Sequence, residues 1–544
     1  MALGVMVEGV ADGNTAHVVT GSVLIAFLVA LMFGVFSIMI PVQTTVTERS
    51  IHEVDQRLMG LANGMGTIEP FEDAGFVDRL TTVRREPSVI VSVVWSSISS
   101  ASFIVGIGAA LAALAYVDPL LLLLPLAGLP VIVATRVAGR MRNRALDEAA
   151  TTRRASDHLF SVLTDPDHGK EVRIFGSGGF LLGAHRAARR DGNRILSRAD
   201  LRASGLVFVG WIFFGAAWCA ALWWVAASAA SGDIGVGQVA TVIAMANVIQ
   251  NQVTGMSGFT HDLVSGTGMV KRYLWLEGHS RRAPRGEATV NRTSGPTGIT
   301  FTDVSYRYPG AQADALSDVN VSIPGGTSVM IVGENGAGKS TFVRLLLGLA
   351  TPTRGEVTFS GPGSDARSGD RTPATAAFQD AARFEFTLRE SIGVGAIDRL
   401  DDGQSVRRAL SDSGARFSVA DLDAQLGRQW GGRELSGGQW QQVAVARSFM
   451  RSNVDLLVFD EPNAGLDPVI EDRLYQRYMR ARERIVTGSG ISVLVTHRIS
   501  PGVSADLVLV FREGRLAEVG SHEELVRRGG RYSELYELQV RAYR

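Results

Sequence analysis

Long apolar stretches fill the first half of the chain and are absent from the second. Stretches without a charged side chain, with histidine counted as neutral, cover residues 13–47, 87–117, 119–135, 203–232 and 234–260. A helix needs about 20 apolar residues to cross the hydrocarbon core of a bilayer, whereas a helix of about 10 to 14 is more typical of a buried core. The pattern therefore predicts five membrane-crossing helices.

The second half has a different periodicity. From residue 299 onward, short apolar runs alternate with helical patterns, which is typical of an α/β domain. The segment 277–298 is polar, contains Pro and Gly, and has no periodicity. We predict a multidomain chain with an all-α transmembrane helical bundle over residues 1–276, a linker over 277–298, and an α/β nucleotide-binding domain over 299–544.

Charge is distributed unevenly, although the 54 basic and 54 acidic residues cancel. Residues 1–47 contain no Lys or Arg, whereas 136–202 contain 14. The positive-inside rule then places the basic segment in the cytoplasm and the N-terminus outside. Five crossings leave residues 261–544 in the cytoplasm, where ATP is. The single cysteine, Cys219, excludes disulfides and cysteine-based metal sites, and we expect no nucleic-acid partner.

A phosphate-binding loop is predicted at GENGAGKST, which follows the apolar strand SVMIV and precedes the helical run TFVRLLLGL. Glycines let successive backbone N–H groups point at phosphate oxygens, and the helix N-terminus adds its positive end. We expect Lys339 to meet the β- and γ-phosphates and Ser340 to bind Mg²⁺. The expected nucleotide-binding residues of this loop are Gly333, Asn335, Gly336, Gly338, Lys339, Ser340 and Thr341.

Two acids end the next clear strand, VDLLVFDEP. Asp460 suits the coordination shell of Mg²⁺, since a carboxylate at a strand end can reach the metal through water. Glu461 suits the general base that orients or deprotonates an attacking water. The alternative use of these acids is to cap a helix or to form a surface pair.

Three further side chains are candidates for the same site. His497 ends the strand SVLVTH, and ligands of α/β sheets bind at the carboxyl ends of strands, so we expect it to face the γ-phosphate. Gln379 follows a short apolar stretch and could bind Mg²⁺ or water. Tyr308 precedes a glycine turn upstream of the phosphate loop, where an aromatic ring can stack on adenine. Packing is the competing use, and Tyr306 lies on the same side of its strand.

A second glycine pair opens another helix, in RELSGGQWQQ. Two glycines and a small hydroxyl at a helix N-terminus can bind phosphate. Without a lysine and an acidic strand beside it, such a site cannot hydrolyse a phosphate ester. The lysine and the acidic residues needed for hydrolysis must then come from another part of the assembly. The alternative is that the Ser-Gly-Gly step only caps its helix.

The ordered set of Tyr308, GENGAGKS, Gln379, LSGGQ, VDLLVFDEP, AGLDP and VTH resembles the nucleotide-binding domain of ATP-binding cassette (ABC) transporters. The membrane half ahead of it resembles that of an exporter-type half-transporter. The resemblance implies that ATP held by one copy also contacts the LSGGQ segment of a second copy, and that Asp467 lies between the copies. The residues implied in that second contact are Ser436, Gly437, Gly438 and Gln439.

Two features depart from the family. Its membrane half normally has six crossings, and our count of five leaves the first one missing. Either the helix has been lost, or the start codon is incompletely assigned. The family often has an acidic, glycine-containing segment ahead of LSGGQ, but this chain has Trp430 and Arg433 there, in QWGGRELSGGQ. This difference puts in doubt whether the segment carries communication between the two copies. The family's cytoplasmic loops rest on the nucleotide domains near the Gln-containing loop, and we assign that role to IEPFEDAGF and LTDPDHGKEV.

The expected function is ATP-driven export by a dimer of half-transporters, with ATP and Mg²⁺ as cofactors. The partner copy could be identical or different, and the cargo could be a drug, a lipid or a peptide. We expect an ATP hydrolase in a bacterial plasma membrane, in contact with lipid, with its nucleotide domain in the cytoplasm. A non-transporting, ATP-responsive regulator or channel subunit is the alternative. The fused domains speak against an importer.

Overall fold

Contacts between residues divide the chain into two compact units. The computed structural model describes residues 6–7, 9–10, 13–231, 234–282, 291–293, 298–360, 374–415, 421–461, 468–497 and 504–542. The first unit comprises Met1–Leu58 and Thr82–Trp275, and the second comprises Met59–Thr81 and Leu276–Arg544. The second unit therefore includes a short segment from the first half of the sequence.

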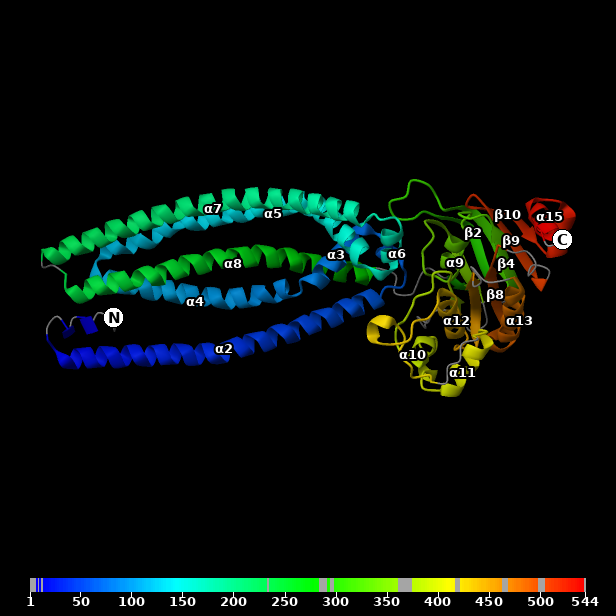
Figure 1. Cartoon of the computed structure of the whole chain (residues 1–544), viewed down its shortest axis with the longest axis horizontal. Coiled ribbons are helices and arrows are strands. Elements are labelled where there is room, and N and C mark those ends of the chain that lie inside the picture. Colours follow the sequence, from blue (N-terminus) through cyan, green and yellow to red (C-terminus); the bar gives the residue numbers. More distant parts are fainter. Residues whose placement is uncertain are drawn as a thin grey trace. The chain divides into compact units, whose positions relative to one another are not determined.

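Helices make up the first half of the chain (Figure 1). They are α2 (Thr15–Asn63), α3 (Ala74–Arg85), α4 (Ser88–Val117), η2 (Pro119–Gly128), α5 (Leu129–Thr164), α6 (Pro166–Ile174), α7 (Gly178–Ala230) and α8 (Val236–Arg282). Within the described residues, four stretches are long and apolar enough to cross a membrane, namely α2, α4, Pro119–Thr164 and α7. They contain the first four predicted spans. The fifth, residues 234–260, falls in α8 and stays a prediction.

An apolar core joins α4, η2, α5, α7 and α8 in the first unit. Leu114 of α4, Val131 of α5 and Val253 of α8 are buried in it together with Phe214 and Trp218 of α7. The rings of Phe214 and Trp218 stack with centroids 6.3 Å apart. The ring of Trp218 thus packs inside the helical unit.

The second unit contains two sheets. The four-stranded sheet has the order β1 (Asn291–Thr293), β5 (Arg354–Ser360), β2 (Gly298–Tyr306), β3 (Leu316–Pro324). The six-stranded sheet has the order β10 (Arg515–Gly520), β9 (Leu507–Arg512), β4 (Ser328–Gly333), β8 (Val486–Val495), β7 (Val454–Asp460), β6 (Ala374–Ala377). Its strands from β9 to β6 pair in parallel, and β10 is antiparallel. The predicted fold class, a helical bundle followed by an α/β domain, is confirmed.

The second unit also contains helices, and several of them form a helical lobe beside the six-stranded sheet (Figure 1). They are η1 (Glu69–Glu72), α9 (Lys339–Leu346), α10 (Leu388–Gly393), η3 (Ile397–Arg399), α11 (Gly403–Asp412), η4 (Arg428–Trp430), α12 (Gly437–Ser448), α13 (Pro468–Ile485), α14 (His522–Arg528) and α15 (Arg531–Ala542). Strands β4 and β7 are buried almost throughout, as expected of parallel strands covered on both faces.

Three aromatic rings link the two sheets through α9. Phe342 of α9 stacks on Phe301 of β2 with centroids 4.4 Å apart, and its centroid lies 5.1 Å from that of Phe511 on β9. All three side chains are buried. The helix that follows the glycine loop is therefore fixed by the core on its inner side.

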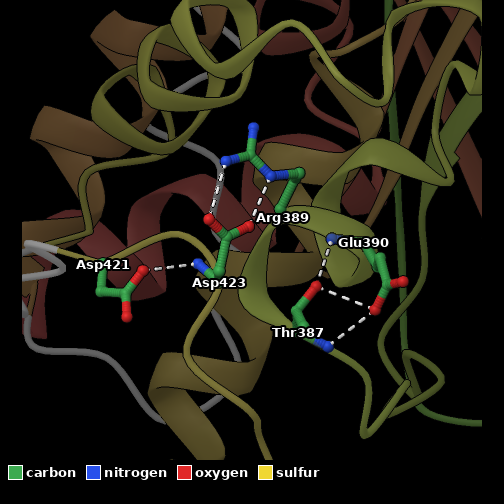
Figure 2. A network of polar contacts seen from close by, with 5 residues as sticks. All are labelled: Thr387, Arg389, Glu390, Asp421 and Asp423. Atoms are coloured by element: carbon green, nitrogen blue, oxygen red, sulfur yellow. Dashed lines mark hydrogen bonds and ion pairs between the residues drawn. The ribbon is translucent and has the colours of Figure 1, made fainter.

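Polar contacts order the start of α10 in the helical lobe (Figure 2). The hydroxyl of Thr387 accepts a hydrogen bond from the backbone of Glu390, whose carboxylate accepts one from the backbone of Thr387. Arg389 donates two hydrogen bonds to Asp423, at 2.7 and 3.1 Å, and its guanidinium lowers the pKa of that carboxyl. These contacts tie α10 to the loop around Asp421.

The predicted linker begins later than its polar composition indicated. Residues 277–282 continue α8, because the end of this helix packs on the segment from the first half of the chain. The hydroxyl of Ser280 donates a hydrogen bond to the carbonyl of Leu61 at 3.1 Å, and the ring of His279 lies 5.5 Å from that of Phe76. Tertiary packing thus outweighs the helix-breaking composition that follows.

Truncating the central aromatic cluster should destabilise the second unit. We expect Phe301→Ala to lower its free energy of unfolding by about 3 to 5 kcal/mol, because the change leaves a cavity against Phe342. Phe301→Leu, which keeps most of the volume, should cost clearly less. Urea unfolding of the purified protein measures both, and equal midpoints for the two variants would contradict this description of the core.

Candidate nucleotide-binding and hydrolysis site

The glycine loop between β4 and α9 needs its glycines for steric reasons. Gly333, Gly336 and Gly338 have φ values of 154°, 78° and 100°, which side chains rarely allow. A Cβ on Gly333 would lie 2.4 Å from the carbonyl oxygen of Phe511, and one on Gly338 would lie 2.7 Å from Leu316. The loop therefore presents its backbone beside the N-terminus of α9, the arrangement that binds phosphate.

Lys339 is held inside this loop. Its ammonium group donates hydrogen bonds to the carbonyls of Gly333 and Glu334 at 2.8 and 3.1 Å, and it lies 3.8 Å from a carboxylate oxygen of Glu461. Burial lowers the pKa of Lys339, while Glu461 and Asp460 raise it. The residue is only 5% exposed, so its charge acts at short range in a site of low dielectric.

Asp460, at the end of β7, is a carboxylate that lacks a full set of partners. It is 5% exposed, and its Oδ1 has no hydrogen-bond partner among the described residues. Burial raises the pKa of Asp460, the neighbouring charge of Glu461 raises it further, and a hydrogen bond from Ser340 lowers it. An unpartnered carboxylate oxygen beside a serine hydroxyl fits a divalent cation that prefers oxygen ligands.

This cation site would be sparse. Over the described ranges there is no cluster of three or more His, Cys, Asp or Glu side chains able to hold a metal ion. Mg²⁺ commonly uses one or two protein oxygens together with the phosphates of its substrate, so Ser340 and Asp460 suffice for such a site.

Glu461 and His497 meet at the carboxyl ends of β7 and β8. His497 Nε2 lies 2.6 Å from Glu461 Oε1, and the side chain of His497 remains 43% exposed. Glu461 has a positive φ of 47°, and its backbone N–H donates to the carbonyl of Val495 at 3.1 Å. The backbone turns at Glu461, so that its carboxylate lies between Lys339 and His497.

Tyr308 and Tyr306 have different environments. Tyr306 is buried, which raises its pKa, and it belongs to the core. Tyr308 is half-buried, its hydroxyl lies 3.0 Å from that of Thr341, and the guanidinium of Arg344 lies 5.6 Å from the centre of its ring. The core role falls to Tyr306, and adenine stacking by Tyr308 stays a prediction.

The segment Glu69–Glu72 lies against the start of the nucleotide domain within the second unit. Glu69 accepts a hydrogen bond from the backbone N–H of Thr351 at 2.9 Å, and Glu72 accepts one from Arg344 at 2.5 Å. The backbone N–H of Ile68 donates to the carbonyl of Leu349. We expected this segment near the Gln-containing loop, but the contacts described for it are with α9 and the turn that follows.

Sequence reasoning missed Arg344 as a functional residue. Its guanidinium contacts both Glu72 and Tyr308. Arg344 therefore joins the segment Glu69–Glu72, which we call the docking segment, to the helix α9 that follows the glycine loop. A signal was available in the sequence, because Arg344 is a basic residue within the apolar run TFVRLLLGL.

Gln379 lies apart from the contacts described so far. It is exposed in the turn after β6, at the same edge of the sheet as Asp460. Its role as a ligand of Mg²⁺ or water stays a prediction. Asp467 lies outside the described residues.

The segment Ser436–Gln439 forms the N-terminus of α12. The hydroxyl of Ser436 accepts from the backbone N–H of Gln439 at 3.3 Å, and the side chain of Gln439 accepts from the backbone N–H of Ser436 at 2.9 Å. Gly437 and Gly438 are exposed with open space around them. In the described part of the chain no hydrogen bond or ion pair links these residues to Lys339 or its loop.

The structure confirms the capping role of the Ser-Gly-Gly step, and phosphate binding by the same segment stays a prediction. The side chains of Ser436 and Gln439 cap the helix, and the two glycines leave the surface beside the helix terminus uncovered. The buried side chains of Leu435 and Trp440 fix the segment to the helical lobe.

Trp430 stands near this surface. It is 65% exposed, and its indole N–H donates to Glu385 at 3.1 Å. Leu426 and Arg433 pair through their backbones, which closes the loop that carries Trp430.

Residues 316–464 match the model of the ABC transporter family. The C-terminal half carries an ABC transporter domain. The solved structure of a bacterial Atm1-family ABC exporter with ATP bound matches 97% of this chain and 91% of its own, with a TM-score of 0.76 and 22% identity. The chain as a whole thus has the fold of an ABC exporter, a membrane domain fused to an ABC domain.

Two curated relatives have higher identity. The nisin transport ATP-binding protein NisT of Lactococcus lactis subsp. lactis is 34% identical over 245 residues, which cover 44% of this chain and 40% of NisT. The subtilin transport ATP-binding protein SpaT of Bacillus subtilis is 31% identical over 320 residues, which cover 57% of this chain and 51% of SpaT. The chain thus spans about half the length of these ABC relatives.

The raised pKa of Asp460 in the ABC domain predicts how stability varies with pH. A carboxyl whose folded pKa exceeds its unfolded value, about 3.9, favours folding below that value, and this contribution is lost as the pH rises through the folded pKa. At pH 7, without Mg²⁺, we expect Asp460→Asn to stabilise the domain by about 1 kcal/mol, because it removes a buried charge. The gain should shrink toward pH 4.

Urea midpoints at several pH values measure this difference. Asp455→Asn is the matched control, since Asp455 lies on the same strand and accepts from Thr487 at 3.1 Å. It should show no such gain. A gain for Asp460→Asn that grows as the pH falls would contradict the proposed electrostatics of the site.

Proposed function

We propose that the chain hydrolyses ATP to drive export across a membrane, as one half of a dimeric transporter. The arrangement of Lys339, Glu461 and His497 around the glycine loop carries the proposal. A cation, a carboxylate and an imidazole at the ends of three adjacent strands can bind a terminal phosphate and activate water beside it.

The roles follow from position. Lys339 and the loop backbone neutralise the β- and γ-phosphates, and Tyr308 stacks on the base. Ser340 and Asp460, with help from Gln379, would hold Mg²⁺, which would supply charge stabilisation to the phosphates. Glu461 accepts the proton of the attacking water, and His497, 2.6 Å from that carboxylate, holds it in place while facing the γ-phosphate.

A second copy completes each site. Gly437 and Gly438 leave open space at the N-terminus of α12, whereas the described contacts of Lys339, Glu461 and His497 are with one another and with the glycine loop. In a dimer these glycines, with Ser436 and Gln439, contact the ATP bound by the other copy. ATP then joins the two domains, and hydrolysis releases them. A ligand shifts a conformational equilibrium only by its different affinity for the two states, and this shared site provides that difference.

The docking segment transmits the change. Glu72 contacts Arg344, which lies on the helix that opens at Lys339 and touches the ring of Tyr308. This segment belongs to the compact ATP-binding unit, but it is continuous in sequence with the long helix α2. Movement of the nucleotide domain on ATP binding therefore pulls on a membrane helix.

The printed names of two relatives bear on the class of cargo. The printed names of NisT and SpaT refer to transport of nisin and subtilin, which favours a peptide-like cargo over a drug or a lipid. We place the protein in a bacterial plasma membrane with the nucleotide domain in the cytoplasm. ATP-dependent uptake into inverted vesicles, with peptides, lipids and drugs in parallel, tests this. A regulator would show neither uptake nor stimulation of ATPase activity by cargo.

Replacing the proposed base should separate binding from hydrolysis. We expect Glu461→Gln to retain ATP binding and to reduce turnover by about a hundredfold or more, because an amide cannot accept the proton of water. A dimer trapped with ATP should accumulate on size-exclusion chromatography. Asp455→Asn, on the same strand, should hydrolyse ATP normally. Wild-type turnover in Glu461→Gln would exclude this residue as the base.

Weakening the docking contact should uncouple the two units. We expect Glu72→Gln to keep ATPase turnover within about twofold while reducing the ATP-dependent movement of the membrane helices, because it removes the charge that faces Arg344. The chain's single cysteine, Cys219, is exposed on α7 and accepts a spin label, so that the distance between two labels in a dimer reports this movement.

Glu53→Gln is the matched control, because Glu53 also pairs with an arginine, Arg57, but within one helix. It should leave the ATP-dependent distance change intact. If Glu72→Gln showed the same distance change as the wild type, the contact with Arg344 would have no role in coupling.

A further inference from the structure

The C-terminal helix α15 contacts two separate loops of the nucleotide site. Near its start, the guanidinium of Arg531 donates to the carboxylate of Glu334 in the glycine loop at 2.5 Å. Near its end, the side-chain amide of Gln539 donates to the backbone carbonyl of His497 at 2.6 Å. Arg531 and Gln539 are eight positions apart, which corresponds to about two helical turns. One rigid element thus touches both the phosphate-binding loop and the loop that carries the histidine.

The helix itself is anchored firmly. Tyr532 is fully buried against β4 and β9, in a cluster with Met330 and Val508. Its hydroxyl lies 2.7 Å from Nδ1 of His522 on α14. The carboxylate of Glu518 accepts hydrogen bonds from the first two backbone N–H groups of α15, at 2.6 and 3.2 Å. The contacts near the two ends of α15 therefore connect both loops to a helix that is fixed on the sheet.

Each contact reaches a residue that the site already uses. The carbonyl of Glu334 accepts from Lys339, while its carboxylate binds Arg531, so one residue joins the helix to the phosphate-binding lysine. His497 is held from two sides, because its ring meets Glu461 and its carbonyl meets Gln539. Arg531 is also held by Glu534 at 2.9 Å, which keeps its guanidinium oriented.

We propose that α15 is a strap that sets the position of the hydrolytic groups, with Gln539 positioning His497 and Arg531 positioning the phosphate loop. The inference rests on the proposed ATP hydrolysis. Both residues act through the groups that they contact, Arg531 through Glu334 and Gln539 through the backbone carbonyl of His497. The exposed ion pair of Arg531 adds little to stability, so the proposed effect of the two contacts is on the geometry of the loops.

The two contacts should have different kinetic signatures. We expect Gln539→Ala to lower kcat for ATP about threefold to tenfold with KM nearly unchanged, because a displaced histidine affects the chemical step. Arg531→Ala should instead raise KM about threefold with kcat nearly unchanged, because the loop that binds phosphate loses a support. Gln539→Lys and Arg531→Lys, which keep a donor, should restore most of each loss.

The experiment uses the full-length protein in lipid nanodiscs, with steady-state ATPase kinetics in Mg²⁺. Glu537→Ala is the matched control, since Glu537 lies on the same helix and pairs along it with Arg541 at 3.4 Å. It should behave as the wild type. With wild type and control active, a wild-type kcat in Gln539→Ala or a wild-type KM in Arg531→Ala overturns the strap and leaves the proposed function standing. Absence of ATPase activity in the wild type overturns both.

Discussion

Parallel pairing of three strands is the constraint on which the site depends. Ile331 of β4 and Asp460 of β7 both pair with Val495 of β8, so one row across the sheet fixes where all three strands end. The glycine loop, the two acids and the histidine leave the sheet from this row. A slip of one residue in any strand would reverse which face its side chains meet. The residues next to this row are buried, over 328–332 of β4, 456–460 of β7 and 490–495 of β8, and this burial holds the register.

Two charged side chains of the site are buried at an electrostatic cost. Lys339 and Asp460 are nearly enclosed. Burial lowers the pKa of Lys339 and raises the pKa of Asp460, which favours the neutral form of each. Their mutual attraction offsets only part of this cost. The site is therefore arranged for charges that arrive with a substrate, and its stability and its chemistry make opposite demands on the same residues.

Much of this could be predicted from the sequence, because its strongest signals are local. The order of strand, glycine loop and helix predicted the phosphate site, and the strand ends predicted that Asp460, Glu461 and His497 converge. Contacts made by residues far apart in sequence carry no such pattern. The pairing of Glu72 with Arg344 and of Gln539 with the His497 carbonyl depends on tertiary placement alone. Residues 277–282, which continue α8, were predicted as linker for the same reason, since composition does not report what packs against a helix.

The left-handed backbone at Glu461 has an evolutionary consequence. A residue with a side chain held at φ 47° is strained by about 1 kcal/mol, and glycine would relieve that strain. The carboxylate also pairs with two groups that the fold does not require for its core. On the proposed role of Glu461 as the base, loss of this side chain would relieve the strain, keep the fold and remove hydrolysis. In a dimer of two unlike copies, one such substitution would turn one copy into a subunit that binds nucleotide without hydrolysing it.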